Sequence, residues 1–542
     1  MLFKKLVTIA IASLLLIFSG NAVAQSPSFK IGKSIDIQFN VLRELSMLYV
    51  DSVDIDQLVM RATEAMLESL DPYTTIISDQ DRESFEMLTT GSYGGIGSII
   101  RKDGPEVLIS EVYENTPAAK NGLNAGDRII SINGVSVASL RVDECSDMLK
   151  GAPGTTVCLI IKKLRSGETE ELNIKREKIH ISDVAYSGMI SDTTGYIRIT
   201  GFTFGGAKDV RKALLALRKN KNLKRVVLDL RGNGGGILDE AVEIVSLFVP
   251  RGTKVVSSIG KFKQADIDYY TSDDPVDTEI PLVVMVNTAS ASSSEIVAGA
   301  LQDLDRATVV GTRTFGKGLV QSVRDLGYNN RLKITTAKYY TPSGRCVQAI
   351  DYSQRNEDGS VGFIPDSLIT SFKTLNLGRT VYDGGGITPD VTLETQSFSR
   401  VAVALIYGEI IHDYSIEYFR SNDSIASPSL FEMTDREYLQ FVEWAKEKEF
   451  DHRTATEVEF DKMLSIAKRE SVYEELKESF SQMEKQIKFT KEQVLMRSKE
   501  EIKQLLEEEI SNRYYFQRGR IESMLRNDTQ VKEAASVKLI NM

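Results

Sequence analysis

The pattern of apolar and polar positions divides the chain into segments of different character. Between residues 25 and 91 apolar residues recur at helical spacing, as they do from Ile35 to Leu45, which predicts a helical N-terminal region. Residues 92–176 instead carry short apolar runs separated by Gly, Pro and Asn-Gly turn signals, with one helical stretch before Gly151. This second pattern is typical of a small β-rich module.

Residues 177–398 alternate apolar strands with amphipathic helices. The runs at 223–230, 281–286 and 307–311 are almost continuously apolar, as in strands buried on both faces, and helical patterns follow the first two. This order predicts an α/β fold in which helices cover a sheet.

The region from 399 to 542 is helical and highly charged. It contains an apolar stripe made of Leu495, Ile502, Leu506 and Ile510. The stripe predicts a solvated helical domain that packs on the rest of the chain and supports the assembly or docks a partner. The alternative is an oligomerisation helix or an adaptor surface.

Charge and composition exclude several classes of function. The chain has 542 residues and a net charge of −10, which is not the basic footprint that a nucleic-acid partner requires. Its three cysteines and three histidines are far apart in the sequence, so they indicate neither a disulfide framework nor a metal site.

The first 24 residues have the pattern of a signal peptide. Lys4 and Lys5 precede an apolar run from Leu6 to Phe18, and Ala22-Val23-Ala24 supplies a small-x-small cleavage site. The run is shorter than the roughly 20 residues that a spanning helix needs. We therefore expect an exported protein, periplasmic in a bacterium. The alternative is an uncleaved N-terminal anchor that associates the protein with a membrane.

A candidate nucleophile lies in the stretch NTASASSSEIVAGAL, residues 287–301. Ser292 stands at a predicted strand-to-helix turn, where free N–H groups and the helix dipole stabilise negative charge. It also stands three residues before Glu295, so the alternative is a capping box with no role in catalysis. The glycines of DLRGNGGG, residues 229–236, allow backbone N–H groups to approach a substrate closely; the alternatives for this run are a phosphate nest or a plain turn.

A candidate base lies in GTRTFGKGLVQ, residues 311–321. Burial of Lys317 among glycines and apolar residues would favour the neutral amine. If the segment is extended, Gln321 lies on the same side and accepts a hydrogen bond from that amine. The alternative is a surface lysine on a glycine-rich loop.

Together these motifs resemble the carboxy-terminal processing (tail-specific) protease family, and TAKYYTPSGR and GGGITPDV extend the resemblance over residues 30–395. The resemblance implies a Ser-Lys protease with a crotonase- or Clp-protease-like α/β core. It assigns Ser292 as nucleophile, Lys317 as general base and Gln321 as its orienting partner, with Gly235 and Ser293 donating backbone N–H groups to an oxyanion. Family members usually have alanine where this chain has Ser293, and many have proline at Gly234.

The same resemblance implies a PDZ domain at 92–176. Its peptide-binding residues would be Gly94, Gly95, Ile96, Gly97 and Val142. Such a domain adds an extended peptide to a sheet edge and captures its terminal carboxylate with backbone N–H groups. Ser98 stands where PDZ loops usually carry an apolar residue, which affects the pocket for the terminal side chain.

The expected protein is thus an exported serine endoprotease that binds protein C-termini and cleaves upstream, without a metal, nucleotide or organic cofactor. Two alternatives are a catalytically inactive PDZ scaffold and a crotonase-like acyl-thioester enzyme. The expected order along the chain is signal peptide 1–24, helical region 25–91, PDZ domain 92–176, protease core 177–398 and helical domain 399–542.

Overall fold

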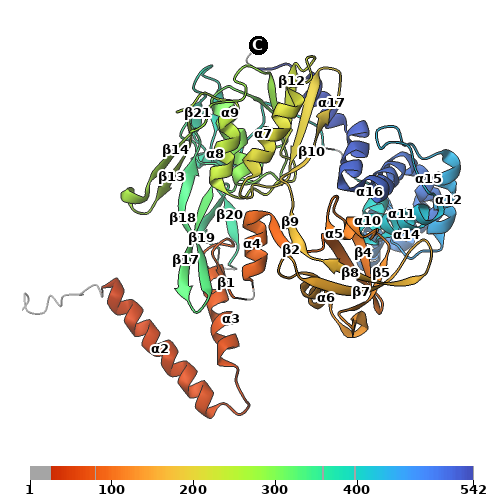
Figure 1. Ribbon diagram of the computed structural model, residues 1–542, viewed down its shortest axis with the longest axis horizontal. Helices are drawn as coiled ribbons and strands as arrows, with labels where there is room; N and C mark the ends of the chain where they lie inside the picture. Colours follow the sequence, from red (N-terminus) through yellow and green to blue (C-terminus); the bar gives the residue numbers. More distant parts are fainter. Residues whose placement is uncertain (1–25, 80, 357–358, 396–397, 541–542) are drawn as a thin grey trace, which may run out of the picture. The chain divides into compact units, whose positions relative to one another are not determined.

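The computed structural model describes residues 26–79, 81–356, 359–395 and 398–540 (Figure 1), so the predicted signal peptide lies outside the described residues. The N-terminal part is helical, as predicted. Helix α2 (Pro27–Leu48) begins where the Ser26 hydroxyl accepts a hydrogen bond from the N–H of Phe29, and α3 (Ile55–Glu68) begins at Asp54. None of the described helices is long and apolar enough to cross a membrane. A short strand, β1 (Thr75–Ile77), and helix α4 (Arg82–Thr90) follow.

The β-rich module forms as predicted and begins after α4. Its strands and helices are β2 (Ser92–Gly95), β3 (Ser98–Asp103), β4 (Glu106–Val112), α5 (Pro117–Lys120), β5 (Arg128–Ile132), β6 (Val135–Ser136), α6 (Val142–Leu149), β7 (Thr156–Lys162), β8 (Thr169–Lys175) and β9 (Glu177–His180). Strands β3, β4, β5, β7 and β8 form the main sheet, while β2 pairs with β9. Asn133 and Gly134 both have positive φ, which confirms the predicted Asn-Gly hairpin turn.

The α/β core is built on a six-stranded sheet in the order β10-β11-β12-β15-β16-β23. Its strands are β10 (Val184–Met189), β11 (Thr194–Ile199), β12 (Arg225–Asp229), β15 (Leu282–Val286), β16 (Thr308–Gly311) and β23 (Val391–Thr392), and its helices are α7 (Gly206–Leu217), α8 (Leu238–Ser246) and α9 (Ser293–Asp303). Apart from the β10–β11 pair, the strands are parallel. This topology confirms the sheet-and-helix core that the apolar runs predict.

The two faces of this sheet are buried by different parts of the chain. Val226, Leu228 and Val284 face the cluster that contains α7, α8 and α9. The alternate residues Val227 and Val283 pack instead against a cluster contributed by the C-terminal end of the chain, including Val531, Ala534 and Leu539. Figure 1 shows this end, helix α17 (Thr529–Ser536), beside β10 and β12. The C-terminus is therefore a structural layer of the core, and this explains why the strands are apolar on both sides.

A second sheet lies next to the core sheet and carries a long ribbon. Strands β13 (Lys254–Gly260), β14 (Ile267–Tyr270), β17 (Leu319–Gly327) and β18 (Asn330–Tyr340) pair antiparallel. Two small hairpins follow, β19 (Ile350–Arg355) with β20 (Val361–Phe363) and β21 (Ser371–Lys373) with β22 (Thr380–Tyr382).

The C-terminal domain is helical, as predicted. It consists of α10 (Arg400–Tyr407), α11 (Ile410–Ser421), α12 (Asp435–Lys446), α13 (Ala455–Arg469), α14 (Tyr473–Ile487), α15 (Lys491–Arg497), α16 (Lys499–Asn527) and α17. The predicted apolar stripe is buried in the core of this domain, where Leu495, Ile502, Leu506 and Ile510 have no exposed surface. The stripe thus packs within the chain, as the helical-domain interpretation predicts.

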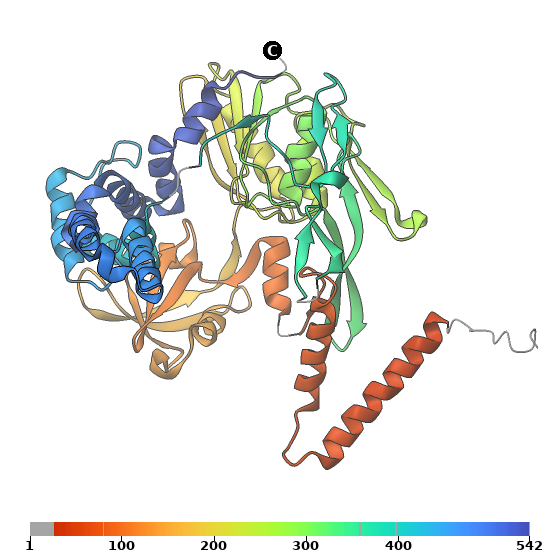
Figure 2. The same ribbon diagram turned by 180° about the vertical axis from the view of Figure 1, so that it is seen from behind.

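Helix α16 connects the helical domain to the β-rich module (Figure 2). Arg513 Nη1 donates to the carbonyl oxygen of Ser110 on β4 at 2.6 Å, and Arg101 on β3 forms an ion pair with Asp413 on α11. The helix is interrupted at Tyr515 and Phe516, and the Phe516 ring packs against the core of the module. The helical domain therefore fixes one side of the β-rich module.

Candidate active site

Ser292 occupies a strained turn between β15 and α9. Its φ of 56° and ψ of −115° are uncommon for a residue with a side chain, and such angles are concentrated at functional sites. The residue is half-buried and directly precedes the helix, so its hydroxyl lies where the N-terminal dipole of α9 stabilises negative charge. The turn has the strand–turn–helix geometry of a nucleophile, although the sequence has no Gly-x-Ser-x-Gly motif.

The three other serines of this stretch fasten the glycine-rich loop to the Ser292 turn. The hydroxyl of Ser290 donates to the carbonyl oxygen of Leu230 at 2.8 Å, that of Ser293 to Gly236 at 3.0 Å and that of Ser294 to Asn233 at 2.9 Å. The four serines thus divide into one candidate nucleophile and three positioning groups. The hydroxyl at Ser293, the position where the family usually has alanine, contributes one of these contacts.

The carboxylate of Glu295 connects Ser292 to the loop that carries Lys317. Its Oε2 accepts hydrogen bonds from the N–H groups of Ser292 and Lys317, each at 2.8 Å. Its Oε1 accepts from the Thr314 hydroxyl at 2.6 Å and from the Gly316 N–H at 2.8 Å. Burial raises the pKa of Glu295, and these four hydrogen bonds oppose that shift. The Ser-x-x-Glu pattern thus marks more than a helix cap, because its carboxylate also positions a segment more than 20 residues away in sequence, at Lys317.

Tyr339 connects the same two residues on their carbonyl side. Its hydroxyl lies 2.5 Å from the carbonyl oxygen of Lys317 and 3.1 Å from that of Ser292, and the residue is only 1% exposed. Ser292 and Lys317 are therefore both fixed by their N–H groups and by their carbonyl groups. Tyr339 belongs to the motif TAKYYTPSGR, but the sequence gives no sign of its role. The contact exists because β18 lies beside the Ser292 turn.

The glycine-rich loop lies directly against the Ser292 turn. A Cβ on Gly235 would lie 2.7 Å from the Ser292 Cβ and 2.9 Å from the N of Ser293, whereas a Cβ on Gly234 would meet nothing within 4 Å. Gly235 has a φ of +96° and its N–H donates to Asn233 Oδ1 at 2.9 Å. The structure thus places the two predicted oxyanion donors, Gly235 and Ser293, next to each other. In this structure the Gly235 N–H points at the Asn233 side chain.

Gln321 lies on β17, four residues after Lys317. Its Nε2 donates to Thr335 Oγ1 on the neighbouring strand at 3.2 Å. The register between β17 and β18 shifts between Val320 and Gln321, so the simple alternation assumed for this segment is interrupted there. The role of Gln321 as the partner of Lys317 stays a prediction. Phe315, one of the apolar residues near Lys317 in the sequence, is 47% exposed.

Arg231 ties the same glycine-rich segment to the C-terminal end of the chain. Its guanidinium forms ion pairs with Asp229 at 2.6 Å and with Asp528 at 2.7 Å, and it donates to Gln530 Oε1 at 2.8 Å. Asp528 also caps α17 by accepting from the N–H of Val531 at 2.9 Å. The Asp528 carboxylate thus has two roles. It caps α17, which covers the core sheet, and it holds Arg231 beside the glycine-rich loop.

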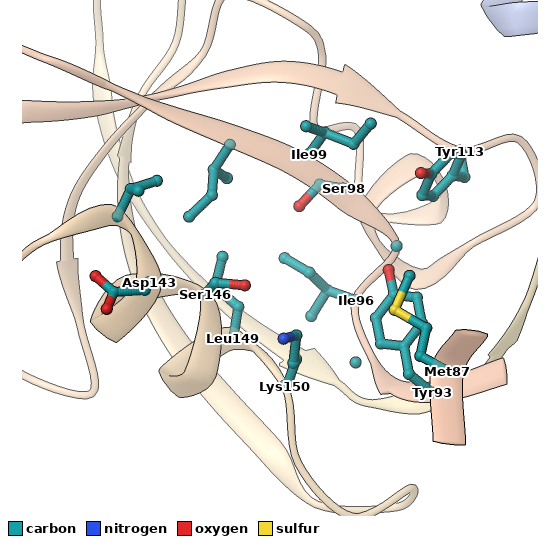
Figure 3. A pocket seen from close by; sticks show the side chains of 14 residues that line it. Met87, Tyr93, Ile96, Ser98, Ile99, Tyr113, Asp143, Ser146, Leu149 and Lys150 are labelled. Carbon is teal, nitrogen blue, oxygen red and sulfur yellow. The ribbon is translucent and has the colours of Figure 1, made fainter. Parts of the chain in front are cut away.

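The β-rich module carries a pocket between β3 and α6 that encloses about 350 Å³ (Figure 3). Of the predicted peptide-binding residues, Gly95, Ile96, Gly97 and Val142 line it. Gly94 does not line the pocket. It packs against the backbone of Gly151, whose N–H donates to the Gly94 carbonyl at 3.1 Å.

The pocket contains further residues that the sequence analysis did not assign to it. These are Met87, Tyr93, Ile99, Ile100, Tyr113, Asp143, Ser146, Leu149 and Lys150; Ser98, which was expected to affect the pocket for the terminal side chain, lines it as well. Met87 belongs to α4, outside the expected limits of the module, so no signal within the module could have identified it.

These features define a class of protein: an α/β serine peptidase with a PDZ-type peptide pocket and an added helical domain. Three family models match successive parts of the chain. They are PDZ domain at residues 85–162, Peptidase family S41 at 193–355, and Probable PDZ-protease, C-terminal helical domain at 401–537.

Two relatives with similar sequences support the same class. The chain is 35% identical over 315 residues to a carboxy-terminal-processing protease of Bartonella bacilliformis, which covers 57% of this chain and 72% of the relative. It is 33% identical over 349 residues to the carboxy-terminal processing protease CtpA of Bacillus subtilis, covering 64% and 74% of the two chains. It is also similar to the solved photosystem II D1 C-terminal processing protease, with 27% identity, coverage of 66% and 92%, and a TM-score of 0.36.

The chain belongs to the carboxy-terminal processing proteases of peptidase family S41. It is accordingly a serine-type endopeptidase, and the family resemblance inferred from the sequence motifs is confirmed. The α/β core with an inserted PDZ domain and helical terminal regions is confirmed as well.

Proposed function

We propose that this protease is exported, works by a Ser-Lys mechanism, and binds the C-terminal tails of proteins through its PDZ domain before cleaving upstream in the core. The observation that carries the mechanism is the shared acceptor: the N–H groups of Ser292 and Lys317 both bind Glu295 Oε2. A carboxylate that fixes both segments favours a nucleophile and a base that act as a pair.

In the proposed reaction the neutral Lys317 amine removes the proton from the Ser292 hydroxyl as the oxygen attacks the scissile carbonyl carbon. The tetrahedral oxyanion accepts hydrogen bonds from the N–H groups of Gly235 and Ser293. For Gly235 this requires its N–H to leave Asn233 Oδ1. The C–N bond then breaks, the Lys317 ammonium returns its proton to the leaving amine, and an acyl-enzyme ester remains. A water molecule, deprotonated by Lys317, hydrolyses the ester.

The mechanism is tested by comparing the mature wild-type protein with three variants, Ser292→Ala, Lys317→Ala and Lys317→Arg, on an unfolded protein with a free C-terminus. We expect each variant to lose essentially all turnover, because arginine stays charged and accepts no proton. Lys333→Ala, which changes a partly exposed lysine on β18, is a control that should keep full activity. Turnover by the Lys317→Arg variant at the wild-type rate would contradict the mechanism, and absent turnover in the wild type under every condition would favour a PDZ scaffold.

Export and substrate class are tested in the source cells. The signal-peptide pattern and the family membership support an exported enzyme that trims protein C-termini. We expect N-terminal sequencing of the mature protein to begin after Ala24. We also expect mass spectrometry of exported proteins to find extended C-termini when Ser292 is replaced by alanine. Recovery of the full-length chain from the cytoplasm alone would contradict export.

A further inference from the structure

The PDZ pocket contains one lysine whose position suits a peptide's terminal carboxylate. The walls of the pocket are mostly apolar, and Ile96 and Leu149 are 2% and 5% exposed. Only two of the lining residues are charged, Asp143 and Lys150. In Figure 3 Asp143 and Lys150 lie well apart, and Lys150 is on the same side of the pocket as Ile96, Tyr93 and Met87.

Asp143 and Lys150 differ in how closely an oppositely charged side chain already pairs with them. Asp143 forms an ion pair with Arg141 at 2.6 Å, and this partner lowers the pKa of Asp143 to about 2. Lys150 has a looser contact, with its Nζ 3.7 Å from an oxygen of Asp147, a residue whose side chain is 75% exposed. A solvated pair at that distance contributes little, so the ammonium can turn to a ligand at small cost.

Lys150 also stands next to the loop that we expect to bind the carboxylate. Its Cα lies 3.8 Å from where a Cβ on Gly95 would be, and the following residue, Gly151, donates its N–H to the Gly94 carbonyl. The end of α6 is thereby joined to the strand that leads into Ile96, Gly97 and Ser98. Gly97 has a φ of +82°, a conformation that favours glycine.

A helix C-terminus would normally repel an anion, because its last carbonyl groups carry partial negative charge. Here the buried Arg176 neutralises that end of α6. Its Nε donates to the Leu149 carbonyl at 3.0 Å and its Nη2 donates to the Met148 carbonyl at 2.7 Å. Two carbonyl groups at this end of α6 are thus paired with a cation, which offsets the repulsion that an anion near Lys150 would meet.

We propose that the Lys150 ammonium pairs with the α-carboxylate of the substrate tail, in addition to the backbone N–H groups expected there. The terminal side chain would lie against Ile96, Leu149 and Met87. The inference rests on the proposed role of the PDZ domain as the tail-binding module, and it assigns that role a specific charged residue.

The test uses the full-length Ser292→Ala protein and two fluorescent peptides that share a leucine-terminated sequence, one with a free C-terminal carboxylate and one with a C-terminal amide. Binding is followed by fluorescence anisotropy. We expect the free acid to bind about tenfold or more tightly than the amide, as for a charge-assisted hydrogen bond. We expect Lys150→Met to remove most of that ratio, while Lys150→Arg retains it.

Lys175→Met on β8, an exposed lysine of the same domain, is the matched control and should leave the ratio unchanged. An unchanged acid-to-amide ratio in Lys150→Met would overturn the assignment. This includes the case in which the variant loses the same factor of affinity for both peptides. Because Ser292→Ala is used throughout, this outcome is independent of the Ser-Lys chemistry. That chemistry fails separately if the Lys317 variants retain turnover.

Discussion

Ser292 and Lys317 share one hydrogen-bond acceptor, Oε2 of Glu295, and each donates its backbone N–H to it at 2.8 Å. Tyr339 faces their carbonyl oxygens from the other side. The relative position of the two residues is therefore set by two buried side chains, Glu295 at the start of α9 and Tyr339 on β18. This arrangement explains how the backbone of a lysine on a glycine-rich loop, a type of segment that is usually mobile, is held in place.

The first prediction concerns Tyr339→Phe, which removes the hydroxyl and keeps the buried ring. Loss of one hydrogen bond worth about 1–1.5 kcal/mol predicts a fall in kcat of about tenfold, with KM unchanged because no substrate contact is removed. Steady-state kinetics on a peptide substrate measure both constants. Tyr340→Phe is the matched neighbour and should keep the wild-type kcat; a rise in KM alone for Tyr339→Phe would argue against a positioning role.

The second prediction separates two adjacent glycines. In Gly235→Ala the new methyl group would lie 2.7 Å from both the Ala291 carbonyl oxygen and the Ser292 Cβ, at a backbone φ of +96°. We expect turnover to fall by about 100-fold or more, the scale of losing one oxyanion donor.

Gly234→Ala is the control, because its methyl group meets nothing within 4 Å. It should keep activity within about twofold and, by restricting the unfolded chain, it should not destabilise the protein. If the two variants lose activity equally, the close approach at Gly235 has no special part in the reaction.

The third prediction tests the link between the C-terminus and the core. Asp528→Asn keeps a residue that can cap α17 but removes the charge that faces Arg231. We expect a loss of about 1–2 kcal/mol in the free energy of unfolding, together with lower turnover, since Arg231 adjoins the glycine-rich loop. Thermal unfolding and peptide kinetics measure the two effects. Asp423→Asn, an exposed aspartate paired with Arg165, should change neither.

The fourth prediction concerns pH. Burial, with smaller contributions from Asp528 and Glu507, raises the pKa of Glu508 to about 7, and among the described residues only Gln504 donates a side-chain hydrogen bond to it, at 2.9 Å. The folded state thus favours the protonated acid. The contribution of Glu508 to stability is fully present below its unfolded pKa of about 4.3 and is lost as the pH rises through about 7.

Glu508→Gln mimics the protonated form. It should stabilise the protein above pH 7 by up to about 3 kcal/mol and give no gain near pH 4. Thermal midpoints measured across this pH range check the expectation. The exposed Glu533→Gln on α17 should show no such dependence, and a Glu508→Gln gain that is equal at both pH values would contradict the assigned cause.

The sequence by itself determined where the main helices and strands lie and the order in which the candidate catalytic motifs follow one another along the chain. Period-two and period-3.6 patterns are local, so the strand that ends at Val286, the helix that follows Ser292 and the hairpin at Asn133 could be located from neighbouring residues alone. The same local motifs were sufficient to identify the protease family.

Only the tertiary structure decided which residues meet across long separations. Glu295 with Lys317, Tyr339 with Ser292, and Asp528 with Arg231 are brought together by sheet order and by the packing of α17 on the open face of the core. Nothing in a short window of sequence specifies such pairs, because their geometry depends on how whole elements pack. The same reason explains why the apolar stripe of α16 was open to two interpretations until its partners in the helical domain were known.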